Sequence, residues 1–120
     1  MEHAKLMTVA ETGVYTRKAT ALLDEQERLD IIDFLADNPT AGDLIRDSGG
    51  VRKLRWARPG RGKSAGVRII YYFHSDEIPL WLITLFAKNE QANLSADEVR
   101  ALSRMVATFK EELRKRKEER

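Results

Sequence analysis

The second half of the chain contains three hydrophobic runs that predict consecutive β-strands. Residues 51–57 alternate between apolar and polar side chains, and residues 67–73 are mostly β-branched or aromatic. Residues 80–87 are almost wholly apolar, as expected for a strand that is buried on both faces. A glycine-rich cationic segment and a short turn separate the three runs, so we expect them to pair as three antiparallel strands.

Helical spacing of apolar positions predicts two helices before these strands. The first is a brief stretch over residues 15–23. Asp24 is a suitable N-cap residue with Glu27 three positions later, a capping-box pattern that opens a second helix, which ends at Asn38 and Pro39. The expected buried face of this helix consists of Leu29, Ile32, Leu35 and Ala36.

A third helix is predicted after the strands. Ser95 is the expected N-cap, Glu98 completes a second capping box, and Leu94 is placed to pack on Val99. The apolar face that should pack on the sheet comprises Val99, Leu102, Val106, Phe109 and Leu113. We expect the charged segment 110–120 to fray into solvent.

Together these elements predict one α+β domain over residues 1–120, with an open antiparallel sheet, N-terminal helices and a long C-terminal helix. A short first strand is expected within residues 6–14, ending at a break at Gly13. Residues 40–50 are expected to form a connection with one turn. We expect the helices to cover one face of the sheet and to leave the other face free.

Composition excludes several classes of function. The chain has no cysteine, which rules out disulfides, thiolate nucleophiles and cysteine-bound metals. The two histidines, His3 and His74, are far apart in the sequence, so no metal-ligand spacing is present. We therefore expect neither a metal nor a cofactor. The glycine-rich segment lacks the spacing of a nucleotide-binding P-loop. No apolar run is long enough for a signal peptide or a membrane span, so a soluble cytoplasmic protein is expected.

Charge is unevenly distributed along the chain. The net charge is only +2, but residues 46–68 hold eight basic side chains against the single Asp47, with Trp56 among them. Basic side chains neutralise backbone phosphates, and tryptophan and arginine stack on unpaired bases, so single-stranded nucleic acid is a natural partner. The alternative is a solvated strand and loop surface with no ligand.

Two cations near the ends of predicted strands are candidates for chemistry. Alternation places Arg68 and Tyr72 on the face of their strand that we expect to look outward, where an arginine can point at a scissile phosphate. Lys88 ends the apolar strand, and a lysine or tyrosine whose pKa is lowered by nearby positive charge can take part in proton transfer. The alternatives are a cross-strand surface arginine and a solubilising lysine.

Three blocks in this order and spacing resemble the RelE-like toxins of bacterial type II toxin–antitoxin systems, and most closely the HigB branch. The blocks are residues 50–57 (GVRKLRWA), 60–73 (GRGKSAGVRIIYYF) and 85–90 (LFAKNE). The helix over residues 24–39 and the helix start at residues 94–97 also look like that branch.

This resemblance implies a RelE-like fold and a toxin that enters the A site of the 70S ribosome. There it would cleave mRNA without a metal, by attack of a 2′-hydroxyl on the neighbouring phosphorus, and so inhibit translation. It also implies a cognate HigA-like antitoxin with a helix-turn-helix motif, through which alone the pair would bind operator DNA. No membrane is implied.

Site residues carried over from the family are Arg68, at the position assigned to the scissile phosphate, and Lys88, at the basic position after the last strand. The positions matching the basic strand and loop that bind RNA and ribosome are Arg52, Lys53, Arg55, Arg61 and Lys63. Some relatives add a tyrosine or histidine near the C-terminus for proton transfer, and this sequence has neither after Lys88. Tyr72 is the candidate substitute.

A second hypothesis stays open at this stage. The same basic sheet can belong to a relative that binds nucleic acid or protein without cleaving, as gyrase-directed members of the fold do. The paired cations Arg68 and Lys88 favour cleavage, because gyrase-directed relatives generally lack such a cationic cleft.

Overall fold

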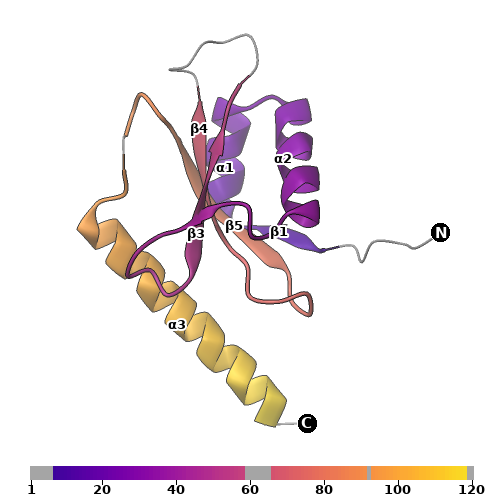
Figure 1. Ribbon diagram of the computed structural model, residues 1–120, viewed down its shortest axis with the longest axis vertical. Coiled ribbons are helices and arrows are strands. Elements are labelled where there is room, and N and C mark those ends of the chain that lie inside the picture. The colour runs from indigo at the N-terminus through magenta and orange to yellow at the C-terminus, as the bar shows by residue number, and fades with distance from the viewer. Residues whose placement is uncertain (1–6, 59–65, 92, 119–120) are drawn as a thin grey trace, which may run out of the picture.

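A computed structural model describes residues 7–58, 66–91 and 93–118, which form three helices and a five-stranded sheet (Figure 1). The elements in chain order are β1 (Val9–Glu11), α1 (Gly13–Leu22), α2 (Glu25–Asp37), β2 (Asp43–Leu44), β3 (Val51–Trp56), β4 (Val67–Tyr72), β5 (Leu80–Ala87) and α3 (Ala96–Glu118). The strand order is β1-β5-β4-β3-β2. The α+β class and the three consecutive antiparallel strands β3, β4 and β5 are confirmed.

The edges of the sheet differ from the sequence prediction. β1 pairs in parallel with β5, so the sheet is mixed, and β1 is much shorter than residues 6–14. The chain leaves it at Thr12, whose hydroxyl accepts from the Tyr15 amide at 3.0 Å and caps α1. Residues 43 and 44 form β2 in what was predicted as a connection. Strands this short are created by pairing with a neighbour, which a local pattern does not reveal.

The capping box of α2 is confirmed. The Asp24 carboxylate accepts from the Glu27 amide at 2.8 Å, and the Glu27 carboxylate accepts from the Asp24 amide at 3.1 Å. The buried face is set by Ile31 and Leu35, both fully buried. The expectation for Leu29 is wrong, since its side chain is 48% exposed on the outer face of the helix.

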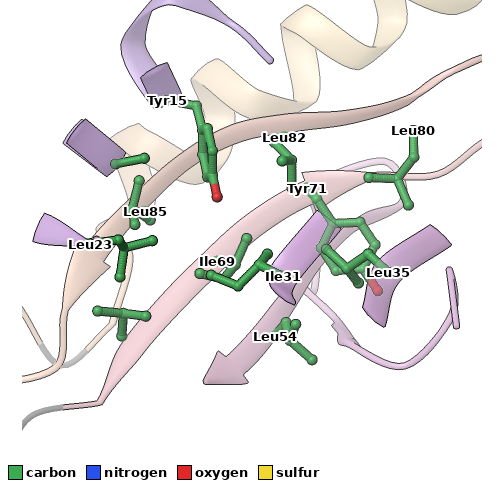
Figure 2. Close-up of a cluster of buried hydrophobic side chains, with 12 residues drawn as sticks. Tyr15, Leu23, Ile31, Leu35, Leu54, Ile69, Tyr71, Leu80, Leu82 and Leu85 are labelled. Atoms are coloured by element: carbon green, nitrogen blue, oxygen red, sulfur yellow. The ribbon is translucent and has the colours of Figure 1, made fainter. Parts of the chain in front are cut away.

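One hydrophobic core lies between the sheet and the helices α1 and α2. Figure 2 shows Tyr15 from α1 and Ile31 and Leu35 from α2 facing the side chains of β3, β4 and β5. The strand residues in this core are Leu54, Val67, Ile69, Tyr71, Leu80, Leu82 and Leu85. Burial raises the pKa of Tyr15, so its phenol stays protonated inside this core.

A second core lies on the opposite face of the sheet, under α3 (Figure 1). Leu102 and Val106 of α3 pack against Val51, Ile70 and other side chains of β3, β4 and β5. The expectation that all helices share one face and leave the other free is therefore wrong. Apolar residues on both faces of the central strands require a cover on both sides.

The start of α3 follows the predicted pattern. The Ser95 hydroxyl accepts from the Glu98 amide at 3.1 Å, and the Glu98 carboxylate accepts from the Ser95 amide at 2.8 Å. The helix then continues to Glu118, so the segment expected to fray from residue 110 is helical through that point. Across the described ranges, no helix is both long and apolar enough to traverse a bilayer.

Candidate nucleic-acid interface

Cations of two neighbouring strands meet on the face of the sheet that carries α3. Arg55 of β3 lies directly opposite Arg68 of β4, and Lys53 lies opposite Ile70. Directly opposite residues point to the same side of a sheet, and Ile70 packs under α3, so the side chains of Lys53, Arg55 and Arg68 emerge on this face. Arg55 and Arg68 lie toward the β3–β4 connection, away from the end where Val51 pairs with Tyr72 under the helix, and Lys53 lies between these two ends.

Lys88 lies at the same end of the sheet. Arg68 is paired with Phe86 of β5, and the ladder continues beyond the strand because the Lys88 amide donates to the Gly66 carbonyl oxygen at 2.9 Å. Lys88 is therefore the diagonal neighbour of Arg68 across the β4–β5 pair, a relation that places two residues about 7–8 Å apart. We call Lys53, Arg55, Arg68 and Lys88 the cationic surface.

The positive charges of the cationic surface are not paired with acidic side chains in the part of the chain that the structure describes. In the described ranges, none of its four side chains forms an ion pair or a side-chain hydrogen bond. Arg55 and Arg68 are like charges directly opposite each other, an arrangement that destabilises a sheet. The Arg68 guanidinium leans toward the loop end, with Nη1 3.8 Å from the point that a Cβ on Gly66 would occupy. Such a surface favours binding of a polyanion, which removes the repulsion.

The chain matches a known protein family over most of its length. The family described as RelE toxin of the RelE/RelB toxin–antitoxin system matches residues 8–119, nearly the whole chain. The chain belongs to the RelE toxin family. It is therefore assigned a toxin role in a toxin–antitoxin system, and the RelE-like fold expected from the resemblance is confirmed.

Arg52 of the toxin is separated from its basic neighbours on β3. It pairs with Tyr71, whose ring belongs to the core on the α1–α2 side, so Arg52 lies on the opposite face from Arg55. Its Nη1 donates to the carbonyl oxygens of Thr40 at 3.2 Å and Gly42 at 2.8 Å. The side chain thus holds the chain between α2 and β2. Alternation along β3 is the sequence signal that separates Arg52 from Lys53 and Arg55.

Two further residues of the basic segment have structural contacts in the toxin. Trp56, considered for base stacking, lies on the α1–α2 side, where its ring contacts the Phe34 ring edge-on at a centroid distance of 5.8 Å. Arg58 donates to both carboxylate oxygens of Glu27, at 2.7 and 2.9 Å, and both side chains are largely buried. Trp56 therefore lies on the opposite face of β3 from Lys53 and Arg55.

Tyr72 lies at the opposite end of β4 from Arg68. The expectation that it faces outward is wrong, because only 5% of it is exposed and its ring packs edge-on against Phe109 of α3 at 5.8 Å. Its hydroxyl is 2.9 Å from His74 Nδ1, and burial raises its pKa. Four residues along a strand separate Tyr72 from Arg68, about 13 Å. Its role in proton transfer stays a prediction, which this placement does not support.

Two predicted binding residues, Arg61 and Lys63, lie outside the described residues. Among the residues that are described, no three His, Asp or Glu side chains gather in a group able to hold a metal ion. The structure thus brings together Lys53, Arg55, Arg68 and Lys88 from the predicted set. It places Arg52 on the opposite face and Tyr72 four residues from Arg68, packed under α3.

Proposed function

We propose that this toxin is a ribosome-dependent, metal-independent endoribonuclease of the HigB branch that cleaves mRNA in the A site and so stops translation. Arg68 binds the scissile phosphate, Lys88 acts beside it, and Lys53 and Arg55 bind the RNA backbone. Its partners are the 70S ribosome, the mRNA and a HigA-like antitoxin with a helix-turn-helix motif. The observation that carries the proposal is the grouping of unpaired cations from three neighbouring segments at one end of the sheet.

The arrangement suits the transition state of RNA cleavage. The 2′-oxygen attacks the adjacent phosphorus, the bond from phosphorus to the 5′-oxygen breaks, and the products are a 2′,3′-cyclic phosphate and a free 5′-hydroxyl. One proton leaves the 2′-hydroxyl and one reaches the 5′-oxygen. Negative charge accumulates on the two non-bridging oxygens during the attack, where the fork of Arg68 and the ammonium of Lys88 stabilise it.

Strand positions give these cations a defined direction. Arg55 and Arg68 are held by the β3–β4 ladder, and the Lys88 backbone is held by its bond to Gly66. Groups fixed before the substrate arrives need no reorganisation during the reaction, and that is the main source of electrostatic catalysis. The ribosome would present the mRNA backbone to this surface in one orientation.

The first test is cleavage of mRNA on programmed ribosomes by purified toxin and by Arg68→Ala. We expect Arg68→Ala to cleave at least about 100-fold more slowly, as for loss of one transition-state donor. Arg46→Ala is the matched control, because Arg46 is an exposed arginine outside the cationic surface. It should cleave at the wild-type rate.

In cells, the same pair of variants is induced without antitoxin, and the 5′ ends of messengers are mapped. New ends inside translated frames, lost in Arg68→Ala, support the proposal. Wild-type cleavage by a folded Arg68→Ala protein would remove Arg68 from the site. Growth arrest without new 5′ ends would contradict the nuclease and favour a toxin that binds gyrase or another target without cleaving RNA.

A further inference from the structure

Gly66 lies between two members of the cationic surface, immediately before β4. The pairing of Val67 with Ala87 continues by one residue, because the Lys88 amide donates to the Gly66 carbonyl oxygen at 2.9 Å. Gly66 is therefore directly opposite Lys88 on the neighbouring strand. It also precedes Arg68 by two positions, so positions 66, 68 and 88 share the face that carries α3.

The backbone conformation does not explain why position 66 is a glycine. The glycines with a positive φ in the described ranges are Gly49 and Gly50, and Gly66 is not one of them. A glycine in a strand ladder costs conformational entropy and gives up side-chain packing. What distinguishes Gly66 is thus the space that a side chain would fill.

The space over Gly66 is taken by the side chain of Arg68. A Cβ atom on Gly66 would lie 3.8 Å from Arg68 Nη1, an ordinary van der Waals contact, and 3.3 Å from the Trp56 carbonyl oxygen. Gly66 is buried although it has no side chain, so neighbouring groups cover it. The Arg68 side chain thus runs back along β4 and ends over the glycine. We call this space the arginine seat.

The arginine seat brings the guanidinium of Arg68 next to Lys88. As residues, Arg68 and Lys88 are diagonal neighbours about 7–8 Å apart. A guanidinium over Gly66 lies directly opposite Lys88 instead, and neighbouring strands are only about 4.8 Å apart. The arginine fork and the lysine ammonium can then contact the non-bridging oxygens of one phosphate rather than those of two successive phosphates.

Electrostatic attraction does not account for this position of the guanidinium. Across the described ranges, neither Arg68 nor Lys88 forms an ion pair, and the two like charges repel each other. The approach of the guanidinium to Lys88 therefore depends on free space over Gly66. A side chain that filled the arginine seat would make the guanidinium move away from the lysine.

We propose that Gly66 is a positioning residue that holds open the arginine seat, so that Arg68 and Lys88 contact the same scissile phosphate of the RNA. This inference rests on the proposed function for the reaction and adds the feature that aligns its two cations. Binding of RNA in the ground state depends mainly on the number of positive charges, which a change at Gly66 leaves intact. The rate of cleavage depends on their placement.

The test is single-turnover cleavage of mRNA on programmed ribosomes by Gly66→Ala and Gly66→Val. The methyl group of alanine is at van der Waals distance from Nη1, so Gly66→Ala should cleave near the wild-type rate. Valine fills the arginine seat, and we expect Gly66→Val to cleave at least about tenfold more slowly, because a displacement of about 1 Å can cost about 100-fold in rate. Its affinity for ribosomes that hold an mRNA with a 2′-deoxy nucleotide at the cleavage site should be unchanged, since no charge is lost.

Gly13→Val is the matched control. A Cβ atom on Gly13 would also meet an arginine Nη1, that of Arg17 at 3.5 Å, and Gly13 is exposed at the start of α1. This variant should cleave at the wild-type rate. A folded Gly66→Val protein that cleaves as fast as the control would overturn the proposal, as would a loss of ribosome affinity equal to the loss of rate.

A double-mutant cycle separates positioning from a purely structural role. If Gly66 acts through Arg68, Gly66→Val should not slow an Arg68→Ala toxin further, because the group that it displaces is already gone. An equal loss of rate in both backgrounds would mean that valine disturbs the strand at the Trp56 carbonyl. That result would overturn the proposal.

Nuclear Overhauser contacts test the arginine seat without any cleavage, and they decide the matter if circular dichroism shows that Gly66→Val does not fold. In the wild type, the α-protons of Gly66 should contact the end of the Arg68 side chain, and absence of these contacts would overturn the proposal. A toxin that shows the contacts but never cleaves mRNA retains the arginine seat and loses the proposed function. A toxin that cleaves mRNA without the contacts loses only the arginine seat.

Discussion

Neutralising Arg68 should stabilise the fold while it abolishes activity. Arg68 lies opposite Arg55 and diagonal to Lys53 and Lys88, and within the described residues no carboxylate pairs with it. A side chain selected for packing would not be placed among three like charges. The variant Arg68→Gln removes the charge and retains part of the stem and a polar end.

The size of the effect follows from the strand geometry. When the residue separations of a sheet are taken for the charge separations, directly opposite charges about 5.5 Å apart in water repel by about 0.4 kcal/mol at 0.15 M salt, and each diagonal pair about 7.5 Å apart by about 0.2 kcal/mol. Arg68→Gln should therefore raise the free energy of unfolding by about 0.8 kcal/mol. The gain should be about 1.4 kcal/mol at 0.02 M salt and about 0.4 kcal/mol at 0.5 M salt, because salt screens the repulsion.

The assay is urea unfolding of the wild type, Arg68→Gln and Arg46→Gln at these three salt concentrations. Arg46 is exposed and lies outside the cationic surface, so its variant controls for loss of one positive charge. A folded state less stable by 0.5 kcal/mol or more (about the usual scatter of surface variants) in Arg68→Gln would refute the reasoning. Arg68 would then be a packing residue, and its repulsion would not mark a site for phosphate.

Two further predictions concern the supports of the fold. Tyr71→Phe removes a hydroxyl that donates to the Pro39 carbonyl oxygen at 2.9 Å and accepts from the buried Gly42 amide at 2.8 Å. The free energy of unfolding, measured in urea, should therefore fall by about 1–3 kcal/mol. A change under 0.5 kcal/mol (about the scatter of surface variants) would contradict this. Hydrogen bonds from Ser95 hold the pKa of Glu98 below its usual value near 4.5, so its contribution to stability is complete above about pH 4.5 and is lost as the pH falls through the lower folded value. Thermal unfolding from pH 6 to 3 (roughly the range of carboxyl titration) should therefore decline less steeply for Glu98→Gln, and parallel curves would exclude this role.

Local signals in the sequence predicted much of the architecture. The bounds of β5 follow from one almost wholly apolar run, and the starts of α2 and α3 follow from capping boxes, because those hydrogen bonds connect residues three positions apart. The prediction of the buried face of α2 was wrong at Leu29. Helical spacing is compatible with several neighbouring faces, and the position of the sheet determines that Ile31 is buried instead. The two-residue strand β2 has no pattern of its own to detect.

The candidate site was predicted in composition more than in arrangement. The list of cations included Arg55, Arg68 and Lys88, but only the strand register shows that Arg55 and Arg68 are opposite each other. Arg52 lies on the opposite face of β3 from the other cations, and the alternation of side chains along the strand could already have predicted this. Tyr72 was misplaced because only the opposite face of β4 was taken as core, while α3 returns to cover the face that carries Ile70 and Tyr72.

The position of α3 after all five strands has a consequence for the order of folding. Every strand and both N-terminal helices precede α3 in the chain, so the core that contains Tyr15 and Ile31 can close before α3 docks. The opposite face, with Val51 and Ile70, has no cover until Leu102 and Val106 have emerged. The nascent toxin is thus a half-covered sheet until α3 docks, and the face that carries the cationic surface is completed only by that step.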